Sequence, residues 1–356
     1  MIEILLYLLI GFILIYAGGE FLINGGVKFS NALKIDPVVV GLTFIAFGTS
    51  APELFVNVKA AFLGSGGITV GNIIGSNIFN VAFILGLSVL IRPININKFF
   101  LKRDLPYMLA ASVLCILFYV FDDNFSRVEG LILVLGLAFF IYYNIMYAKQ
   151  EENEIKPEIE KEIKHFVSKS SKYEAWVGIL LMALGCVGLY YGSEYFVKGS
   201  IMLAEFLGMS EALIGLTIVA AGTSLPELAA TIIASLKKEN DMAYGNIVGS
   251  NIFNILGILG ISAVIAPIKN SGVRLIDFGM MLLIAILLYA FSYFQTKLSR
   301  LSGFFFFCFI YNLYDLYYTR WIGVIFESRK NRINLIKLIN FFRYYKKCEA
   351  NFHSNS

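Results

Sequence analysis

Two glutamates stand deep inside apolar stretches, with no lysine or arginine directly beside either of them in the sequence. Glu53 and Glu227 end the near-identical segments GTSAPE (48–53) and GTSLPE (222–227). A carboxylate at bilayer depth costs roughly 3 kcal/mol or more, so it is kept where it pairs, binds a cation or lines a watery path. A protonated glutamate hydrogen-bonded between packed helices is the alternative, but two such residues in matching settings favour a cation site.

The residues around each glutamate supply further oxygen atoms. Pro52 and Pro226 lack a backbone N–H and clash with the preceding turn, so each helix should kink or break there. The break would free the carbonyls of Ala46, Thr49, Ala220 and Thr223, and hydroxyls come from Thr49, Ser50, Thr223 and Ser224. An ordinary proline kink is common in membrane helices, but a kink alone does not require an adjacent acid in both segments.

A second pair of matching segments, GNIIGSNIFN (71–80) and GNIVGSNIFN (245–254), contributes amides and hydroxyls. Its polar residues are Asn72, Ser76, Asn77 and Asn80, with Asn246, Ser250, Asn251 and Asn254. Ser76 and Asn80 are four residues apart and therefore share a helix face, as do Ser250 and Asn254. Hydrogen bonding between helices competes with ion binding as the explanation for these polar rows.

Carboxylates, carbonyls, hydroxyls and amides together form an all-oxygen set, which suits hard cations. Ca2+ takes about six to eight flexible oxygen ligands, Na+ could use the same oxygens, and Mg2+ sheds its water reluctantly. Both histidines, His165 and His353, lie in polar segments. The sequence shows no phosphate-binding loop, zinc motif or serine with a plausible base. It therefore predicts a transporter without a cofactor rather than an enzyme.

The composition places these residues in a membrane. Of 356 residues, 58% are hydrophobic and only 15% are charged, and the mean hydropathy is +0.73, which soluble globular proteins rarely show. A spanning helix needs about 20 mostly apolar residues. Ten runs qualify: 3–23, 37–63, 68–92, 105–121, 128–147, 175–197, 211–236, 242–267, 276–294 and 303–325. The first run lacks the positive region of a secretory signal, so we expect it to span the membrane.

The two halves of the chain repeat one another. Residues 41–80 align on 215–254 without a gap, with 20 of the 40 positions identical and a constant offset of 174. Five predicted helices separate equivalent positions, and an odd number reverses the direction of the chain across the bilayer. We therefore expect an all-α polytopic membrane protein of about ten transmembrane helices, as two inverted-topology repeats of five with broken helices 2 and 7.

The predicted boundaries follow from this repeat. They are 1–147 for the first repeat (helices 1–5), 148–174 for a charged loop, 175–302 for the second repeat (helices 6–9), 303–325 for a tenth segment and 326–356 for a basic tail. Asn312 and Asp315 are costly in lipid, which leaves open whether the tenth segment spans.

The distribution of Lys and Arg predicts the orientation. The loops after odd-numbered helices carry 16 of these residues and the opposite loops carry five, with eight more in the tail from Arg320. The positive-inside rule puts the loop 148–174 in the cytoplasm and the N-terminus outside, in a multi-pass protein of the cell membrane. With ten helices the basic tail would lie outside, against the rule.

The paired segments resemble the alpha-repeats of the cation/calcium exchanger superfamily, and are most similar to those of prokaryotic sodium/calcium antiporters, over roughly residues 1–300. The resemblance implies a site between helices 2, 3, 7 and 8. It implies that Glu53 and Glu227 are the central Ca2+ ligands, completed by the carbonyls of Thr49 and Thr223. Flanking Na+ sites would come from Ala46, Ser50, Ser76, Ala220, Ser224 and Ser250, while Asn80 and Asn254 would line the middle.

The resemblance also bears on ion choice. Some relatives carry an aspartate where Asn254 stands, and an acid there is associated with proton or K+ involvement. Asparagine in both repeats favours Na+ without K+. After residue 303 the chain departs from the pattern of the family.

We expect exchange of Ca2+ for Na+ by alternating access, with the glycine-containing first and sixth helices sliding against the rest. The alternatives are a Ca2+/H+ or K+-dependent antiporter, a cation channel and an intramembrane enzyme. The expected partners are Ca2+, Na+ and the lipid bilayer, with no nucleic acid and no obligate protein partner.

Overall fold

The structure is a computed structural model, and it describes residues 2–33, 35–96, 100–122, 124–154, 160–206, 222–269, 273–295 and 297–309. The described chain through Cys308 forms one compact unit. With η denoting a π-helical stretch, its elements are α1 (Ile2–Leu33), α2 (Pro37–Val40), η1 (Gly41–Ile45), α3 (Ala46–Thr49), α4 (Ala51–Phe62), α5 (Gly66–Phe79), η2 (Asn80–Leu85), α6 (Gly86–Ile91), β1 (Ile94–Asn95), η3 (Phe100–Asp104), α7 (Leu105–Asp122), α8 (Arg127–Glu154), α9 (Glu160–Phe206), α12 (Leu225–Leu236), α13 (Asn240–Ile252), η5 (Phe253–Leu259), α14 (Gly260–Ile265), α15 (Leu275–Phe294) and β2 (Lys297–Leu298).

The described helices confirm a polytopic membrane protein. Seven are long and apolar enough to cross a bilayer, and a bent pair, Pro37–Thr49 with Ala51–Phe62, makes an eighth. Two further predicted spans are described only in part, as the short apolar helices Leu225–Leu236 and Arg300–Phe309. Each of the ten predicted runs therefore contains a helix. The basic tail 326–356 lies outside the described residues.

The segment 148–174 differs from the expected charged loop. Helix α8 continues to Glu154 and α9 begins at Glu160, so that only residues 155–159 lie outside the description. Glutamate and lysine are good helix formers, and a polar helix can extend beyond the bilayer because water solvates its side chains. The charges mark the end of the apolar stretch in the sequence but do not predict the end of the helix.

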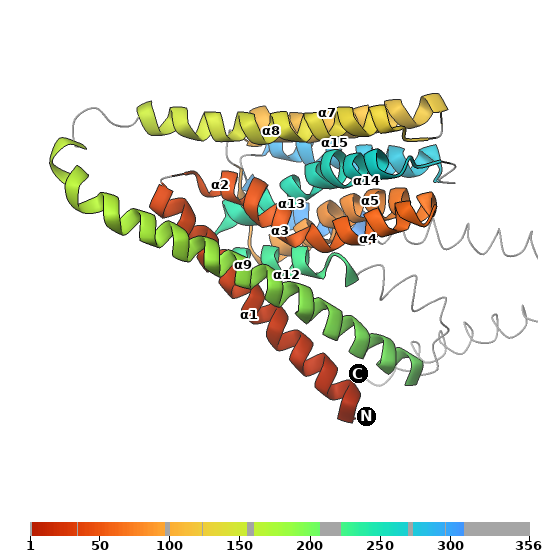
Figure 1. Ribbon diagram of the computed structural model, residues 1–356, viewed down its shortest axis with the longest axis horizontal. Coiled ribbons are helices and arrows are strands. Elements are labelled where there is room, and N and C mark those ends of the chain that lie inside the picture. The colour runs from red at the N-terminus through yellow and green to blue at the C-terminus, as the bar shows by residue number, and fades with distance from the viewer. Residues whose placement is uncertain are drawn as a thin grey trace, which may run out of the picture. The chain divides into compact units, whose positions relative to one another are not determined.

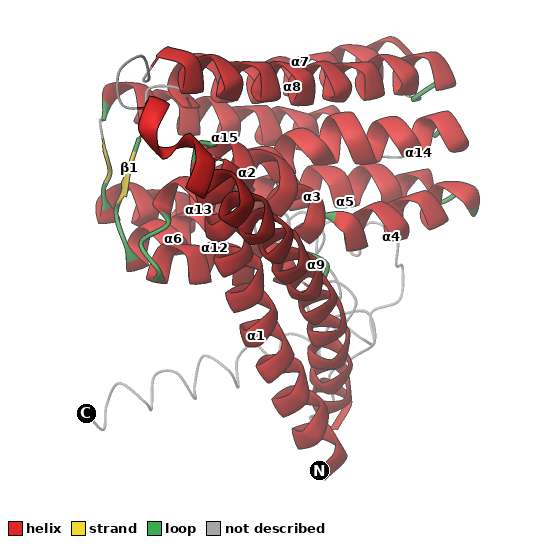
Figure 2. Ribbon diagram, turned by 60° about the vertical axis from the view of Figure 1, so that its left-hand side comes forward, coloured by secondary structure: helices red, strands yellow, loops and turns green. Residues whose placement is uncertain are grey.

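The packing of α1 against α9 shows that the repeats are inverted. These helices hold equivalent positions in the two repeats, and they lie side by side, oblique to the other helices (Figures 1 and 2). A Cβ added to Gly25 would lie 2.7 Å from the Gly178 oxygen, whereas one added to Gly11 would meet the backbone of Phe196. Residues later in α1 therefore contact residues earlier in α9, so the two helices are antiparallel.

Two short extended contacts follow the same symmetry. Ile94 in β1 pairs with Leu298 in β2, and the strands are antiparallel. Ile268, which is 174 residues after Ile94, forms an isolated antiparallel bridge with Phe125. In each case the segment that follows the third helix of one repeat pairs with a segment that follows the fourth helix of the other. The two repeats are therefore interlocked at both ends.

The close approach of α1 and α9 gives a prediction for stability. A Cβ on Gly185 would lie 2.5 Å from the Leu22 backbone nitrogen, so Gly185→Val must push the helices apart, at a cost of about 1–3 kcal/mol. We expect a lower melting temperature in detergent, measured by thermal-shift size-exclusion chromatography. Gly279 has no atom within 4 Å of an added Cβ, so Gly279→Val is the matched control. Equal melting temperatures for both variants would contradict the tight interface.

Candidate cation site between the repeats

The site is built at two matching turns, each of which directly precedes a helix. Ser50 and Ser224 leave helical geometry, with φ/ψ of −86°/3° and −93°/10°, and α4 and α12 begin at the next residue. Each proline falls in the first turn of its new helix, where a missing N–H costs nothing because that group has no partner within the helix. In the first repeat the two half-helices meet at 48°. The predicted break is therefore confirmed in the first repeat. In the second repeat α12 likewise begins directly after Ser224, and residues 207–221 lie outside the described part of the chain.

Each break positions a glutamate in the first turn of a helix. Glu53 and Glu227 are 2% and 1% exposed, and the positive end of a helix dipole favours a negative side chain there. The two carboxyl groups lie within hydrogen-bonding reach of each other. The inverted repeats thus bring together two residues that are 174 positions apart in the chain.

Hydroxyl groups from the opposite repeat hold the two carboxyl groups in place. The Ser50 hydroxyl donates to Glu227 Oε1 at 2.8 Å, and the Ser224 hydroxyl lies against the carboxyl group of Glu53. Thr49 also reaches Glu227. Oε2 of both glutamates has no hydrogen-bond partner among the described residues. One carboxylate oxygen of each repeat is therefore left to take a ligand.

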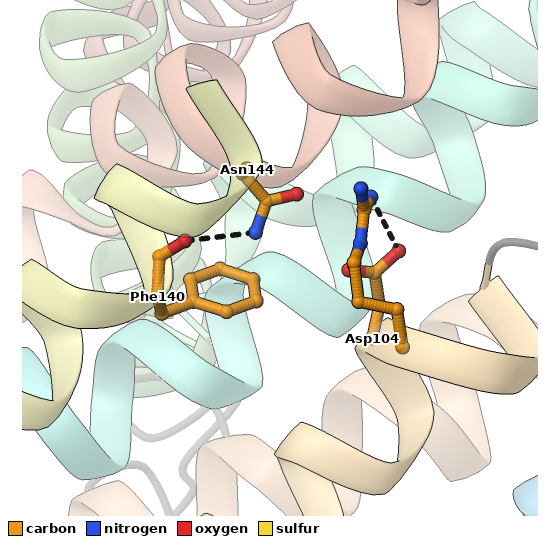
Figure 3. A network of polar contacts seen from close by, with 4 residues as sticks. Asp104, Phe140 and Asn144 are labelled. Atoms are coloured by element: carbon orange, nitrogen blue, oxygen red, sulfur yellow. Dashed lines mark hydrogen bonds and ion pairs between the residues drawn. The ribbon is translucent and has the colours of Figure 1, made fainter. Parts of the chain in front are cut away.

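The electrostatics of the pair call for a positive partner. Two like charges about 4 Å apart repel by roughly 4 kcal/mol at an effective dielectric constant of 20. The ion pairs found within the described chain include neither glutamate. Asp104 shows the contrast, because it is also fully buried but receives bonds of 2.8 and 3.0 Å from Arg103. Figure 3 shows this compensated pair near Asn144, whose amide donates to the Phe140 carbonyl.

The asparagine rows bind the repeats to each other through reciprocal hydrogen bonds. Asn80 Nδ2 donates to Asn251 Oδ1 at 3.1 Å, and Asn254 Nδ2 donates to Asn77 Oδ1 at 3.0 Å. The amides of Asn77 and Asn251 each donate to the other's backbone carbonyl at 3.3 and 3.2 Å. Oδ1 of Asn80 and Oδ1 of Asn254 lack partners within the described part of the chain. These rows therefore tie the helices of the two repeats together, and two of their amide oxygens are not used in doing so.

π-helical stretches place these amides. Stretch η2 begins at Asn80, and η5 begins one residue before Asn254. A π-helical turn inserts an extra residue and rotates the following face of the helix, which often occurs at functional sites. No residue pattern predicts these stretches, although they occur at equivalent positions in both repeats.

The remaining predicted ligands are placed as follows. Thr49 and Thr223 directly precede the two turns. The Ser76 hydroxyl donates to Asn72 Oδ1 at 3.3 Å. The equivalent hydroxyl of Ser250 has no hydrogen-bond partner in the described region. The carbonyl of Ala46 is not freed as expected, because Ser50 N–H and the Thr49 hydroxyl both donate to it, at 3.0 and 3.3 Å. Ala220 lies outside the described residues.

Two further asparagines border the glutamates. Asn246 belongs to the second motif, and its amide donates to the Glu227 carbonyl at 3.4 Å. Asn57 lies outside both motifs, and its amide donates to the Glu53 carbonyl at 2.7 Å. Its position four residues after Glu53, on the same helix face, is the signal that could have indicated it.

The reciprocal asparagine bonds predict energetic coupling between the repeats. Because Asn254 donates to Asn77 Oδ1, replacing both with alanine should cost less than the sum of the single replacements. A double-mutant cycle on the free energy of unfolding should give a coupling energy between the two residues of about 0.5–3 kcal/mol. Asn77 combined with Asn144, which bonds within its own helix, serves as the control and should be additive. Additivity of the Asn77 and Asn254 variants would contradict the cross-repeat bond.

Known proteins share both the sequence and the fold. The family model of the sodium/calcium exchanger protein matches residues 3–146 and 177–319. A protein of Alkalimonas amylolytica described as an antiporter, CaxA, is 36% identical over 264 residues, 74% of this chain and 81% of that protein. The sodium/calcium exchanger MaX1 of Methanosarcina acetivorans is 32% identical over 295 residues, 74% of this chain and 83% of that protein.

Solved structures agree with the sequence comparison. The sodium-calcium exchanger NCX_Mj superposes with a TM-score of 0.76 at 28% sequence identity, over 88% of this chain and 99% of that chain. A broken helix in the first repeat, inverted repeats and matching motifs are thus found together with a family match over most of the chain. The chain belongs to the sodium/calcium exchanger family, and it is a membrane transporter rather than an enzyme.

Proposed function

We propose that the protein exchanges Ca2+ for Na+ across the cell membrane by alternating access at one shared site centred on Glu53 and Glu227. The observation that carries the proposal is the contact between these two buried carboxyl groups, each with an oxygen free for a ligand. One Ca2+ balances both charges, and Na+ ions that need the same carboxylates compete with it. Competition at a single site enforces exchange, because neither ion can occupy the site while the other does.

The proposed ligand set extends outward from the glutamates. The carbonyls of Thr49 and Thr223 would complete the Ca2+ site. Ser50, Ser76, Ala220, Ser224 and Ser250 would form flanking Na+ sites, with Asn80 and Asn254 lining the middle. Support comes from the unpartnered oxygens of Asn80, Asn254 and Ser250. Among solved relatives, NCX_Mj was examined with Na+ and Ca2+ or Sr2+.

The α1–α9 pair would provide the moving element. These helices contact each other through backbone at glycines along most of their length, so they would move together against the helices that carry the site. An empty site leaves two buried carboxylates uncompensated, which disfavours rearrangement, and a bound cation removes this obstacle. In the proposed topology the N-terminus lies outside and residues 148–174 lie in the cytoplasm.

Removing one carboxylate tests the shared site. Glu53→Gln or Glu227→Gln removes one of the two negative charges that would balance Ca2+. Loss of one member of a buried pair of opposite charges costs roughly 3–5 kcal/mol, so Na+-driven 45Ca2+ uptake into proteoliposomes should fall by about 100-fold or more. Glu129→Gln is the control, because Glu129 caps the start of α8 and should leave the exchange rate unchanged. Undiminished exchange in either glutamate variant would end the assignment of the site.

The coupling ion is a separate prediction. We expect an outward-directed Na+ gradient to drive Ca2+ uptake, and K+ or H+ gradients alone to drive none. Two carboxyl groups in contact could instead share a proton, which is the observation that keeps a Ca2+/H+ antiporter as the second candidate. Ca2+ uptake driven by a pH gradient in the absence of Na+ would favour that candidate over the first.

A further inference from the structure

Asn57 lies on the same face of α4 as Glu53, one helical turn further along. Its side chain is fully buried. The amide nitrogen donates to the Glu53 carbonyl at 2.7 Å, and the backbone carbonyl of Asn57 accepts a bond from the Thr69 hydroxyl of α5 at 3.3 Å. The residue is therefore fixed in position by both its side chain and its backbone.

The amide oxygen of Asn57 is left over by this arrangement. Oδ1 is buried and finds no hydrogen-bond partner among the described residues. Turning the amide over would break its bond to the Glu53 carbonyl, so rotation does not relieve the unpartnered oxygen. A buried acceptor without a partner is costly, and Glu53 Oε2 on the same face is unpartnered too. Two such oxygens, one turn apart, mark a line along which a cation would be coordinated.

The second repeat lacks this feature. Thr231 stands at the position equivalent to Asn57, and its hydroxyl accepts a bond from the Asn246 amide at 3.0 Å. The same amide donates to the Glu227 carbonyl. In the second repeat, therefore, Asn246 of α13 donates the hydrogen bond to the glutamate carbonyl that Asn57 donates in the first repeat. Thr231 is not among the described residues that have a buried oxygen without a partner. The leftover amide oxygen belongs to one repeat only.

We propose that Asn57 Oδ1 is a further cation ligand, at which Ca2+ and Na+ pause on their way between Glu53 and the membrane face towards which α4 runs. This inference rests on the proposed exchange function. Amide oxygens are ordinary ligands of such cations, and four residues of helix separate the two positions by about 6 Å. A neutral oxygen holds a cation weakly enough for it to move on, as conduction through successive sites requires.

An unequal pair of repeats has a consequence for transport. Because the repeats are inverted, the α4 end of the site and the α12 end open towards opposite faces of the membrane. Only the membrane face towards which α4 runs, here called the α4 face and extracellular in the proposed topology, has the additional ligand. The protein should therefore bind cations more tightly from that face than from the other.

Asn57→Thr tests this role without removing the structural one. The variant gives the first repeat the residue of the second, and a threonine hydroxyl can donate to the carbonyl four residues earlier, so the Glu53 carbonyl keeps a partner. We expect the KM for Ca2+ and for Na+ at the α4 face to rise about tenfold, with KM at the opposite face unchanged. Exchange is measured separately in right-side-out and inside-out membrane vesicles.

Asn57→Asp provides a second measurement if the threonine variant folds poorly. It retains an oxygen at the position and adds a charge, so KM for Ca2+ at the α4 face should fall, which a purely structural role for Asn57 does not produce. Unchanged KM values in Asn57→Thr, or equal shifts at both faces, would overturn the inference while parent exchange and its loss in Glu53→Gln remain. Absence of Na+-driven Ca2+ exchange in the parent protein would instead overturn the proposed function.

Discussion

The arrangement of this protein depends on two buried carboxyl groups held in contact, which no basic side chain balances within the described part of the chain. Protein interiors tolerate a buried acid when an opposite charge is fixed beside it, as Arg103 is beside Asp104. Glu53 and Glu227 have helix N-termini and hydroxyl groups instead. These dipoles stabilise negative charge without neutralising it, and the proposed exchange assigns the balancing charge to a mobile cation.

The inverted repeat is what makes this geometry available from one short motif. A single segment, GTS-x-PE, yields a break, a helix N-terminus and an acid, and inversion brings two copies face to face at the middle of the bundle. The asparagine rows then fix the distance between copies, because each donates its amide to the opposite repeat. The symmetry is inexact at Asn57 and Thr231. Asn57 donates to the Glu53 carbonyl in the first repeat, whereas Asn246 donates to the equivalent Glu227 carbonyl in the second.

Local chemistry explains which features could be predicted from the sequence. Proline after a glycine-containing turn predicts a break whatever surrounds it, and a repeat with an odd helix count predicts inversion. The pairing of Asn254 with Asn77, the π-helical stretches and the bonded state of the Ala46 carbonyl depend on how helix faces meet, which spacing alone does not give. Asn57 has no matching residue in the second repeat, so a comparison of the two repeats does not single it out.

One measurement tests the central claim most directly, namely that Glu53 and Glu227 together hold a single cation. Anomalous diffraction from crystals containing Sr2+, a substitute for Ca2+, locates the ion without reference to transport. The account predicts one central peak, roughly 2.3–2.6 Å from a carboxylate oxygen of each glutamate, as oxygen ligands of such ions require. A peak bound to one glutamate only, or a central region without any peak while Sr2+ binds elsewhere in the protein, would contradict it.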